Sequence, residues 1–557
     1  MTLYKRLTSV VLIIALAVWL VYSGARHDKR LEEDAINESL DTVQTVYFWY
    51  TDDSLTDYLT RAAVAFHDVN ASVRVIPELV SANEYLERIN EASLEGAQFP
   101  DAYMLKNDSL EKAYMAGLAS AVENYSNVVN VVHFPNAAIN AVTYKNHIVA
   151  YPLYFETSVL AYNKNYLEKW AEQKNAGIKN SSETEDSEDI DWSEVTDPEA
   201  IAQHEAELAK GGTDSTDEAL EGDSDLASED MQPVTYEAFI PKTFDEIQEF
   251  TASYATPEGI DGILRWDVSD VFYNYFFVGK YMNMGGISGD DDSVVDIYND
   301  DVINCLKEYQ GLNQYYAIDS ETSAYSNVLQ DFLDGRIIYT IVTTDAVKTI
   351  SECCEQRKKD AEIAREAADI EKRMGGSINS NAPTDEEATD NKDKSGSDGK
   401  SSDSKETEDT RTELEKAADE AEAKVFEFGY ACMPNITADL ESGSLSVTDT
   451  IVVNGYSPNK AAANSFASFI STDYSENLYE RTGKVAAAKD AAYKNELSTF
   501  VREYNRSIPL CKIVKASNLW VQMEITFTKI WNGGDVESLI KSLADQLNTQ
   551  ISSGESM

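Results

Sequence analysis

Cysteine and histidine are scarce in this chain, which has 557 residues and only five of each. The cysteines are odd in number and none belongs to a CxxC pair, and no two histidines have the i, i+4 spacing of helical metal ligands. We therefore expect neither a disulfide framework nor a structural metal site.

Catalytic motifs are also absent from the sequence. It contains no GxSxG, HExxH, P-loop or GxGxxG pattern, so we expect neither an enzyme nor a bound cofactor. Carboxylates are so abundant that a pair with glycosidase-like spacing carries no information.

Basic residues are outnumbered by more than two to one. The chain has 46 Lys and Arg against 98 Asp and Glu, a formal net charge of −52 and a pI near 4.3. Such a surface repels nucleic acid and anionic lipid headgroups, which excludes both as expected partners. It also weighs against an anionic ligand.

The N-terminus carries one long apolar run. Lys5 and Arg6 precede residues 7–22, and the small residues Ser23 and Ala25 follow. This pattern is typical of an export signal cleaved after Ala25, although the run also approaches the length of a membrane anchor. We favour an anchor for residues 1–25, because no cysteine follows for lipid attachment, with residues 26–42 as a polar spacer. Both alternatives place the rest of the chain outside the cytoplasm.

The folded part begins with alternating strand and helix patterns. β-Branched and aromatic runs predict strands at 43–50, 73–80 and 101–105. Apolar residues at helical spacing predict helices at 54–68, 84–94 and 109–116. The order β-α-β-α-β-α indicates an α/β fold with a mostly parallel sheet.

Two segments interrupt this pattern. Residues 175–232 contain 19 acidic and 2 basic residues and almost no large apolar ones, which predicts a disordered acidic insertion. Residues 352–424 have charged helical ends and a Ser-, Asp- and Gly-rich centre, which predicts two helical arms joined by a low-complexity tip. We expect both insertions to be dispensable for ligand binding.

Several motifs occur in the order found in one family. They are F66-HDVNASVRV-I76, G96-AQFPDAYML, A150-YPLYFETSVLAYNKNYL, I240-PKTFDEIQEF, F332-LDGRIIYTIV and V452-VNGYSPNKAAANSFASFI. Together they resemble the extracellular solute-binding proteins of ABC importers, the family that includes maltose-binding protein. The resemblance covers nearly the whole folded chain.

The resemblance implies a two-lobed fold of the periplasmic-binding-protein type, with hinge strands between the lobes. The implied N-lobe comprises residues 43–153 and 435–482, and the C-lobe residues 154–434 and 483–550. The implied crossings between the lobes lie at 152–156, near 431–434 and at 483–485. The implied function is to bind a carbohydrate in the cleft, as a monomer, and deliver it to permease subunits in the membrane.

The family's ligand contacts fall on polar and aromatic residues of this chain. Aromatic faces and planar polar groups suit sugars, because C–H faces stack and hydroxyls need directional partners. The matching positions are Asp52, Asp53, Lys106, Asn107, Asp108, Glu156, Tyr275 and Trp520. Two tryptophan platforms of maltose-binding protein are replaced by Met104 and Asp345, which weighs against a maltooligosaccharide.

Two alternatives remain open at this point. A sensory receptor of the same fold, coupled to a kinase or a chemotaxis system, would have the same binding chemistry. The pair Tyr315-Tyr316 is similar to the paired tyrosines of ferric-ion receptors, but no matching acid or histidine motif accompanies it.

Overall fold

Three parallel strands begin the main sheet. The computed structural model describes residues 43–96, 98–122, 125–184, 233–257, 259–378, 412–489 and 497–553. In it β1 (Gln44–Tyr50) lies between β2 (Val73–Leu79) and β3 (Ala102–Lys106) and is parallel to both. The helices α2 (Thr56–Val69) and α3 (Tyr85–Glu95) join these strands. The predicted α/β class is therefore confirmed.

The first core forms where helix faces cover this sheet. Tyr58, Leu59 and Phe66 of α2 are buried on one side of the helix, as their spacing predicts. The helix α14 (Lys460–Ser471) packs beside α2. The ring of its Phe466 lies 5.5 Å from that of Phe48 and 5.3 Å from that of Phe66. This core is thus closed by a segment about 400 residues further along the chain.

The long strand β6 (Tyr151–Asn163) links the two lobes. Its first half is antiparallel to β10 (Leu445–Val453), which in turn borders β3. Its second half is antiparallel to β8 (Ile337–Thr343) and β9 (Phe428–Ala431). With β7 (Gly262–Leu264) at the edge, the strand order is β2-β1-β3-β10-β6-β8-β7. The expected first crossing lies on this strand.

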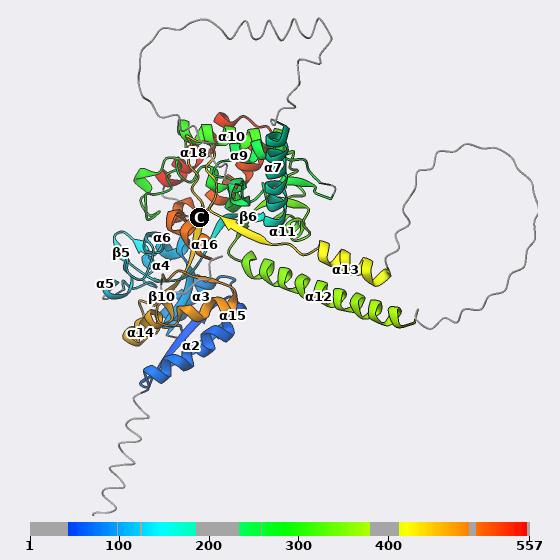
Figure 1. Ribbon diagram of the computed structural model, residues 1–557. Helices are drawn as coiled ribbons and strands as arrows, with labels where there is room; N and C mark the ends of the chain where they lie inside the picture. The colour runs from blue at the N-terminus through cyan, green and yellow to red at the C-terminus, as the bar shows by residue number, and fades with distance from the viewer. Residues whose placement is uncertain are drawn as a thin grey trace, which may run out of the picture.

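A second core fills the other lobe. The ring of Trp266 lies 5.4 Å from that of Trp531, whose Nε1 donates a hydrogen bond to the Ile318 carbonyl. Figure 1 shows the helices of this lobe grouped above the strands and helices of the first. They are α9 (Phe244–Ser253), α10 (Asp300–Tyr316), α11 (Tyr325–Leu333), α17 (Leu519–Trp531) and α18 (Val536–Ser553).

Shorter elements complete the described part of the chain. They are α4 (Leu110–Met115), α5 (Tyr125–Val128), α6 (Asn136–Ala141), β4 (Thr143–Tyr144), β5 (His147–Ile148), α15 (Leu478–Thr482), β11 (Val485–Ala486), α16 (Leu497–Arg506) and β12 (Ile508–Pro509). β11 pairs with β6 and β12 with β10.

The first insertion begins later than the sequence predicts. The helix α7 (Lys164–Thr184) continues nine residues past Asn175, where we expected disorder to start. The Asn175 side chain donates to the Val234 carbonyl at 2.8 Å and accepts from the Val234 amide at 2.9 Å. The two ends of the insertion are therefore fastened together, while residues 185–232 lie outside the described part.

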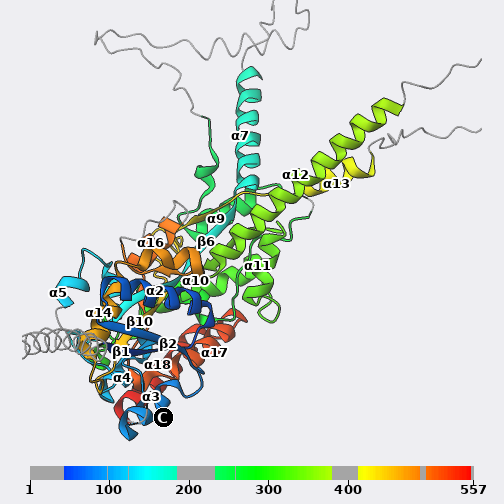
Figure 2. The same ribbon diagram turned by 90° about the horizontal axis from the view of Figure 1, so that it is seen from below.

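The second insertion projects from the body as two helices side by side. α12 (Ala346–Ile378) leaves the body beside β8, and α13 (Glu413–Ala423) returns along it (Figures 1 and 2). Arg365 of α12 forms ion pairs with Asp419 and Glu422 of α13. Residues 379–411, where the low-complexity tip was expected, lie outside the described part.

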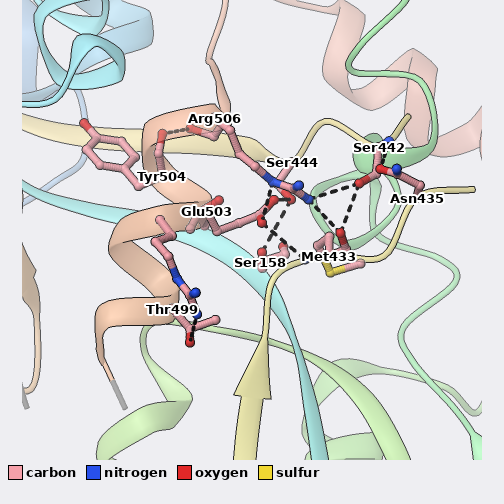
Figure 3. Close-up of polar contacts among 12 residues, drawn as sticks. Ser158, Met433, Asn435, Ser442, Ser444, Thr499, Glu503, Tyr504 and Arg506 are labelled. Atoms are coloured by element: carbon pink, nitrogen blue, oxygen red, sulfur yellow. Dashed lines mark hydrogen bonds and ion pairs between the residues drawn. The ribbon is translucent and has the colours of Figure 1, made fainter. Parts of the chain in front are cut away.

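A buried acid fastens α16 to the linker between β9 and β10. The fully buried Glu503 accepts hydrogen bonds from the Ser444 hydroxyl at 2.5 Å and the Met433 amide at 3.2 Å. Arg506 donates from Nε to Glu503 at 2.8 Å, and through a second nitrogen to the Met433 carbonyl and to Ser442. Figure 3 shows these contacts converging beside β6. Polar bonds of this kind fix the path of the linker near the expected second crossing.

The expected anchor and spacer, residues 1–25 and 26–42, lie outside the described residues. Of the helices in the described ranges, none has the length and apolar character to cross a membrane.

Candidate functional site

A cavity of about 430 Å³ opens at the carboxyl ends of β1 and β3, beside β6 and β10. Ligands of open α/β sheets bind at such strand ends. A neighbouring hollow of about 240 Å³ shares Tyr154, Glu156 and Lys484 with the cavity and extends to Asp345 at the base of α12. The cavity is lined by Thr51, Asp52, Leu55, Ala82, Tyr85, Met104, Leu105, Lys106, Asp108, Ser109, Tyr154, Glu156, Asp449 and Lys484.

Asp52 is held at the wall of the cavity by the short 3-10 helix at Asp53–Leu55. One carboxylate oxygen accepts hydrogen bonds from the Ser54 amide at 3.0 Å and the Ser54 hydroxyl at 2.7 Å. The other lies 2.8 Å from the Lys484 ammonium. Partial burial opposes ionisation, but the hydrogen bonds from Lys484 and Ser54 outweigh it and lower the pKa of Asp52. Asp52 is therefore an anion at neutral pH.

Lys484 lies in the expected crossing at residues 483–485 and forms an ion pair with Asp52 at this wall. It precedes β11, which pairs with β6 at Tyr154 and Phe155. Its ammonium lies 4.8 Å from the centre of the Tyr154 ring, in the geometry of a cation–π contact. The sequence predicted a crossing at residues 483–485 but did not mark this lysine as a site residue.

Asp449 forms part of the cavity from the middle of β10. It faces Lys106 of β3 and Tyr154 of β6 in the strand register, and its side chain is only 7% exposed. Burial raises the pKa of Asp449 to about 7; the nearby Lys106 and Lys484 lower it, and Glu156 raises it further. The sequence analysis missed this residue, because a single acid in an otherwise apolar strand was its only signal.

Four of the eight predicted ligand residues come together in the cavity: Asp52, Lys106, Asp108 and Glu156. Asp53 is exposed in the first turn of the 3-10 helix and lies outside the lining. The loops after β1 and β3 and the crossing strand β6 thus supply one site, although their residues are far apart in sequence.

Asn107 is a correction to the predicted site. It is fully buried, and its side chain donates to the Leu510 carbonyl at 3.1 Å and accepts from the Thr448 amide at 3.0 Å. Both ends of the amide are therefore used to join β3 to β10 and to the segment after β12, and neither faces the cavity.

Tyr275 is a second correction. It is fully buried in the second core, with its ring 5.8 Å from that of Trp520, so it offers no face to a ligand. Trp520 is half-buried and is not among the residues that line the cavity. Its stacking role stays a prediction.

The partly exposed aromatic of this region is Tyr273, two residues earlier. Its ring stacks on that of Tyr325 at 4.5 Å, and the Tyr325 hydroxyl donates to Asp345 at 3.2 Å. Of the two tyrosines in Tyr273-Asn274-Tyr275, Tyr275 is buried and Tyr273 is partly exposed.

Comparison of the whole chain with known proteins finds similarity at the level of structure. No family model and no curated protein sequence matches it. An extracellular solute-binding protein from Staphylococcus aureus, in complex with maltose, aligns with a TM-score of 0.59 and 13% identity over 91% of this chain and 98% of that one. The maltose-binding periplasmic protein of Listeria monocytogenes, also with maltose, aligns with a TM-score of 0.57 and 14% identity over 92% and 100%.

A third structure agrees with these two. A cyclo/maltodextrin-binding protein complexed with maltotetraose aligns with a TM-score of 0.56 and 14% identity, over 91% of this chain and 97% of that one. Nearly the full length of each relative is matched, and β6 joins two lobes here. The chain therefore has the two-lobed α/β fold of the periplasmic-binding-protein type, the fold of these extracellular solute-binding proteins.

Proposed function

We propose that this chain is the extracytoplasmic substrate-binding component of an ABC importer, and that it binds a small carbohydrate. The ligand occupies the cavity between the end of β3 and the crossing strand β6, and the lobes close over it by bending at the crossings. The loaded protein then delivers the ligand to permease subunits in the membrane. A binding role accounts for the chain without any catalytic step.

One observation carries this proposal: the polar cavity lies beside β6, where the lobes join, in a fold whose similar structures hold maltose and maltotetraose. Asp52, Asp108 and Glu156 supply acceptors for hydroxyl groups, and Lys106 and Lys484 supply donors. Tyr85 and Tyr154 supply the aromatic surface against which a sugar ring can pack.

The test is isothermal calorimetry on the purified chain with a library of mono- and oligosaccharides. We expect at least one saccharide to bind with a Kd in the micromolar range, about −8 kcal/mol. Small-angle scattering should show a smaller radius of gyration when that saccharide is added. Clear binding of a peptide or a metal ion, with no heat from any saccharide, would contradict the carbohydrate assignment.

Both insertions should be dispensable for binding. Replacing residues 185–232 and 379–411 with short Gly-Ser linkers should leave saccharide affinity and Tm unchanged. The reason is that contacts outside the replaced residues already hold the two sides of each insertion together. Asn175 is hydrogen-bonded to Val234 in the first insertion, and Arg365 forms ion pairs with Asp419 and Glu422 in the second. Loop length itself adds only about 0.6 kcal/mol of closure entropy per doubling.

The control is a chain that carries the same linkers together with the substitution Asn175→Ala. Its Tm should be lower, because the hydrogen bonds between Asn175 and Val234 are lost. A loss of affinity greater than about tenfold, or 1.4 kcal/mol, in the first variant would mean that an insertion contributes to the site.

A further inference from the structure

Asp449 is a buried acid whose hydrogen-bonding capacity is incompletely used. Its side chain is 7% exposed, yet Oδ2 has no hydrogen-bond partner of normal geometry among the described residues. Tyr154 lies close enough to donate a hydrogen bond to this carboxyl group, but Oδ2 has no such partner. A buried polar atom that lacks a partner costs free energy, so such atoms persist where a ligand or a proton completes them. Asp449 is among the residues that line the cavity, so a ligand that occupies the cavity lies beside it.

The backbone of β10 is irregular at this residue. Its register with β6 shifts between Asp449 and Thr450, so the strand carries a bulge or a similar irregularity there. Bulges turn a side chain away from the regular alternation of a strand and are frequent beside binding sites. The Thr450 hydroxyl donates to the Leu105 carbonyl at 2.7 Å, which fixes the strand on the far side of the shift.

Acidic side chains outnumber basic ones in the lining of the cavity. Four carboxyl groups, Asp52, Asp108, Glu156 and Asp449, face two ammonium groups, Lys106 and Lys484, and Asp449 adds its negative charge when it has lost its proton. Lys484 is engaged by Asp52 at 2.8 Å, and among the described residues no ion pair within 4.0 Å joins Lys106 to Asp449. A cationic group on the ligand would restore the balance. The net charge of −52 favours the approach of such a ligand.

We propose that Asp449 is a ligand-binding residue, and that it selects a saccharide carrying a protonated amine, which donates a hydrogen bond to its free oxygen. This inference rests on the proposed carbohydrate function and narrows it to amino sugars. A charge-assisted hydrogen bond is about twice as strong as a neutral one, which is the physical basis of the selectivity.

The first experiment compares three disaccharides of identical linkage by calorimetry on the full chain: cellobiose, the chitosan disaccharide with free amines, and its N-acetylated form. We expect the free amine to bind about tenfold more tightly than either neutral compound. Equal binding of all three would overturn the inference and leave the carbohydrate function standing. Failure of these and all other saccharides to bind would instead remove the proposed function.

The second experiment uses Asp449→Asn, which keeps the shape of the side chain and removes its charge. The preference for the amine over cellobiose should fall from about tenfold to about twofold. Asp68→Asn, an exposed acid at the end of α2, removes the same charge away from the cavity and should keep the preference. An unchanged preference in Asp449→Asn would overturn the inference, provided that its Tm shows a folded protein.

A third readout needs no variant. The charged groups facing Asp449 are Lys106 from β3, Glu156 from β6 and Lys484 before β11, and the neutral Tyr154 hydroxyl of β6 hydrogen-bonds to it. Near about pH 6.5 much of Asp449 holds a proton, which an incoming ammonium group displaces. Calorimetry in two buffers of different ionisation enthalpy should therefore show proton release when the amino disaccharide binds. Binding without proton release would contradict the contact with Asp449.

Discussion

Replacing Arg506 by alanine is expected to lower the free energy of unfolding by about 2 kcal/mol. The substitution leaves Glu503 fully buried with only the Ser444 hydroxyl and the Met433 amide as donors. It also removes the donor that holds the Met433 carbonyl and Ser442 (Figure 3). Glu503 is fully buried, whereas Arg506 keeps 42% of its side chain exposed. Water can therefore reach part of the space that Arg506 leaves, and the expected loss is smaller than for a pair in which both partners are buried.

Urea denaturation measures this loss, and two further variants make the test specific. Glu503→Gln in the Arg506→Ala background should recover part of the stability, because the uncompensated charge is gone. Arg502→Ala, an exposed arginine on the same helix, should change stability by less than about 0.5 kcal/mol. If Arg506→Ala is as stable as Arg502→Ala, the ion pair does not hold the linker in the way proposed.

The stability of the protein relative to a Lys512→Met variant is expected to rise by about 3 kcal/mol between about pH 7.5 and pH 10.5. Lys512 is fully buried between the lobes. Its ammonium donates to the Asn140 carbonyl of α6 at 3.0 Å and to the Ser288 carbonyl. Burial lowers the pKa of Lys512 from 10.5 to about 8, and nearby Asp290 opposes this shift.

Stability rises with pH because the unfolded chain holds the proton on Lys512 more tightly than the folded protein does. The unfolded chain keeps Lys512 protonated up to pH 10.5, whereas the folded protein releases the proton above about pH 8. Below that value the folded state bears the cost of a buried charge, and this cost disappears as the pH rises through the window. The variant has no titrating group at this position.

Unfolding of the two proteins by urea across this pH range measures the difference. Lys529→Met, at an exposed lysine of α17, is the control and should show no such change with pH. A difference between the protein and Lys512→Met that stays constant from neutral to alkaline pH would show that Lys512 titrates in the folded state as it does in the unfolded chain.

Individual helices and strands could be predicted from the sequence, because the spacing of apolar residues within each one indicates which of its faces is buried. The helix α2 was predicted from the spacing of Leu59, Ala62 and Phe66, and those residues are buried. The acidic composition of residues 175–232 predicted an insertion without reference to any partner, and residues 185–232 of it lie outside the described part. Asp52 and Asp108 were expected as site residues because they match positions of ligand contacts in the solute-binding family that the sequence resembles, and both line the cavity.

Contacts between distant segments were decided only by the tertiary structure. Lys484 reaches Asp52 across more than 400 residues, and Asp449 enters the cavity because β10 inserts between β3 and β6. Whether Tyr273 or Tyr275 is buried likewise depends on packing against Tyr325 and Trp520 rather than on spacing. Periodicity along a chain reports which face of an element is apolar, so it predicted the strands and helices. It does not tell which distant side chains form an ion pair or line the same cavity. For that reason Asp449 and Lys484 could be identified as site residues only from the tertiary structure.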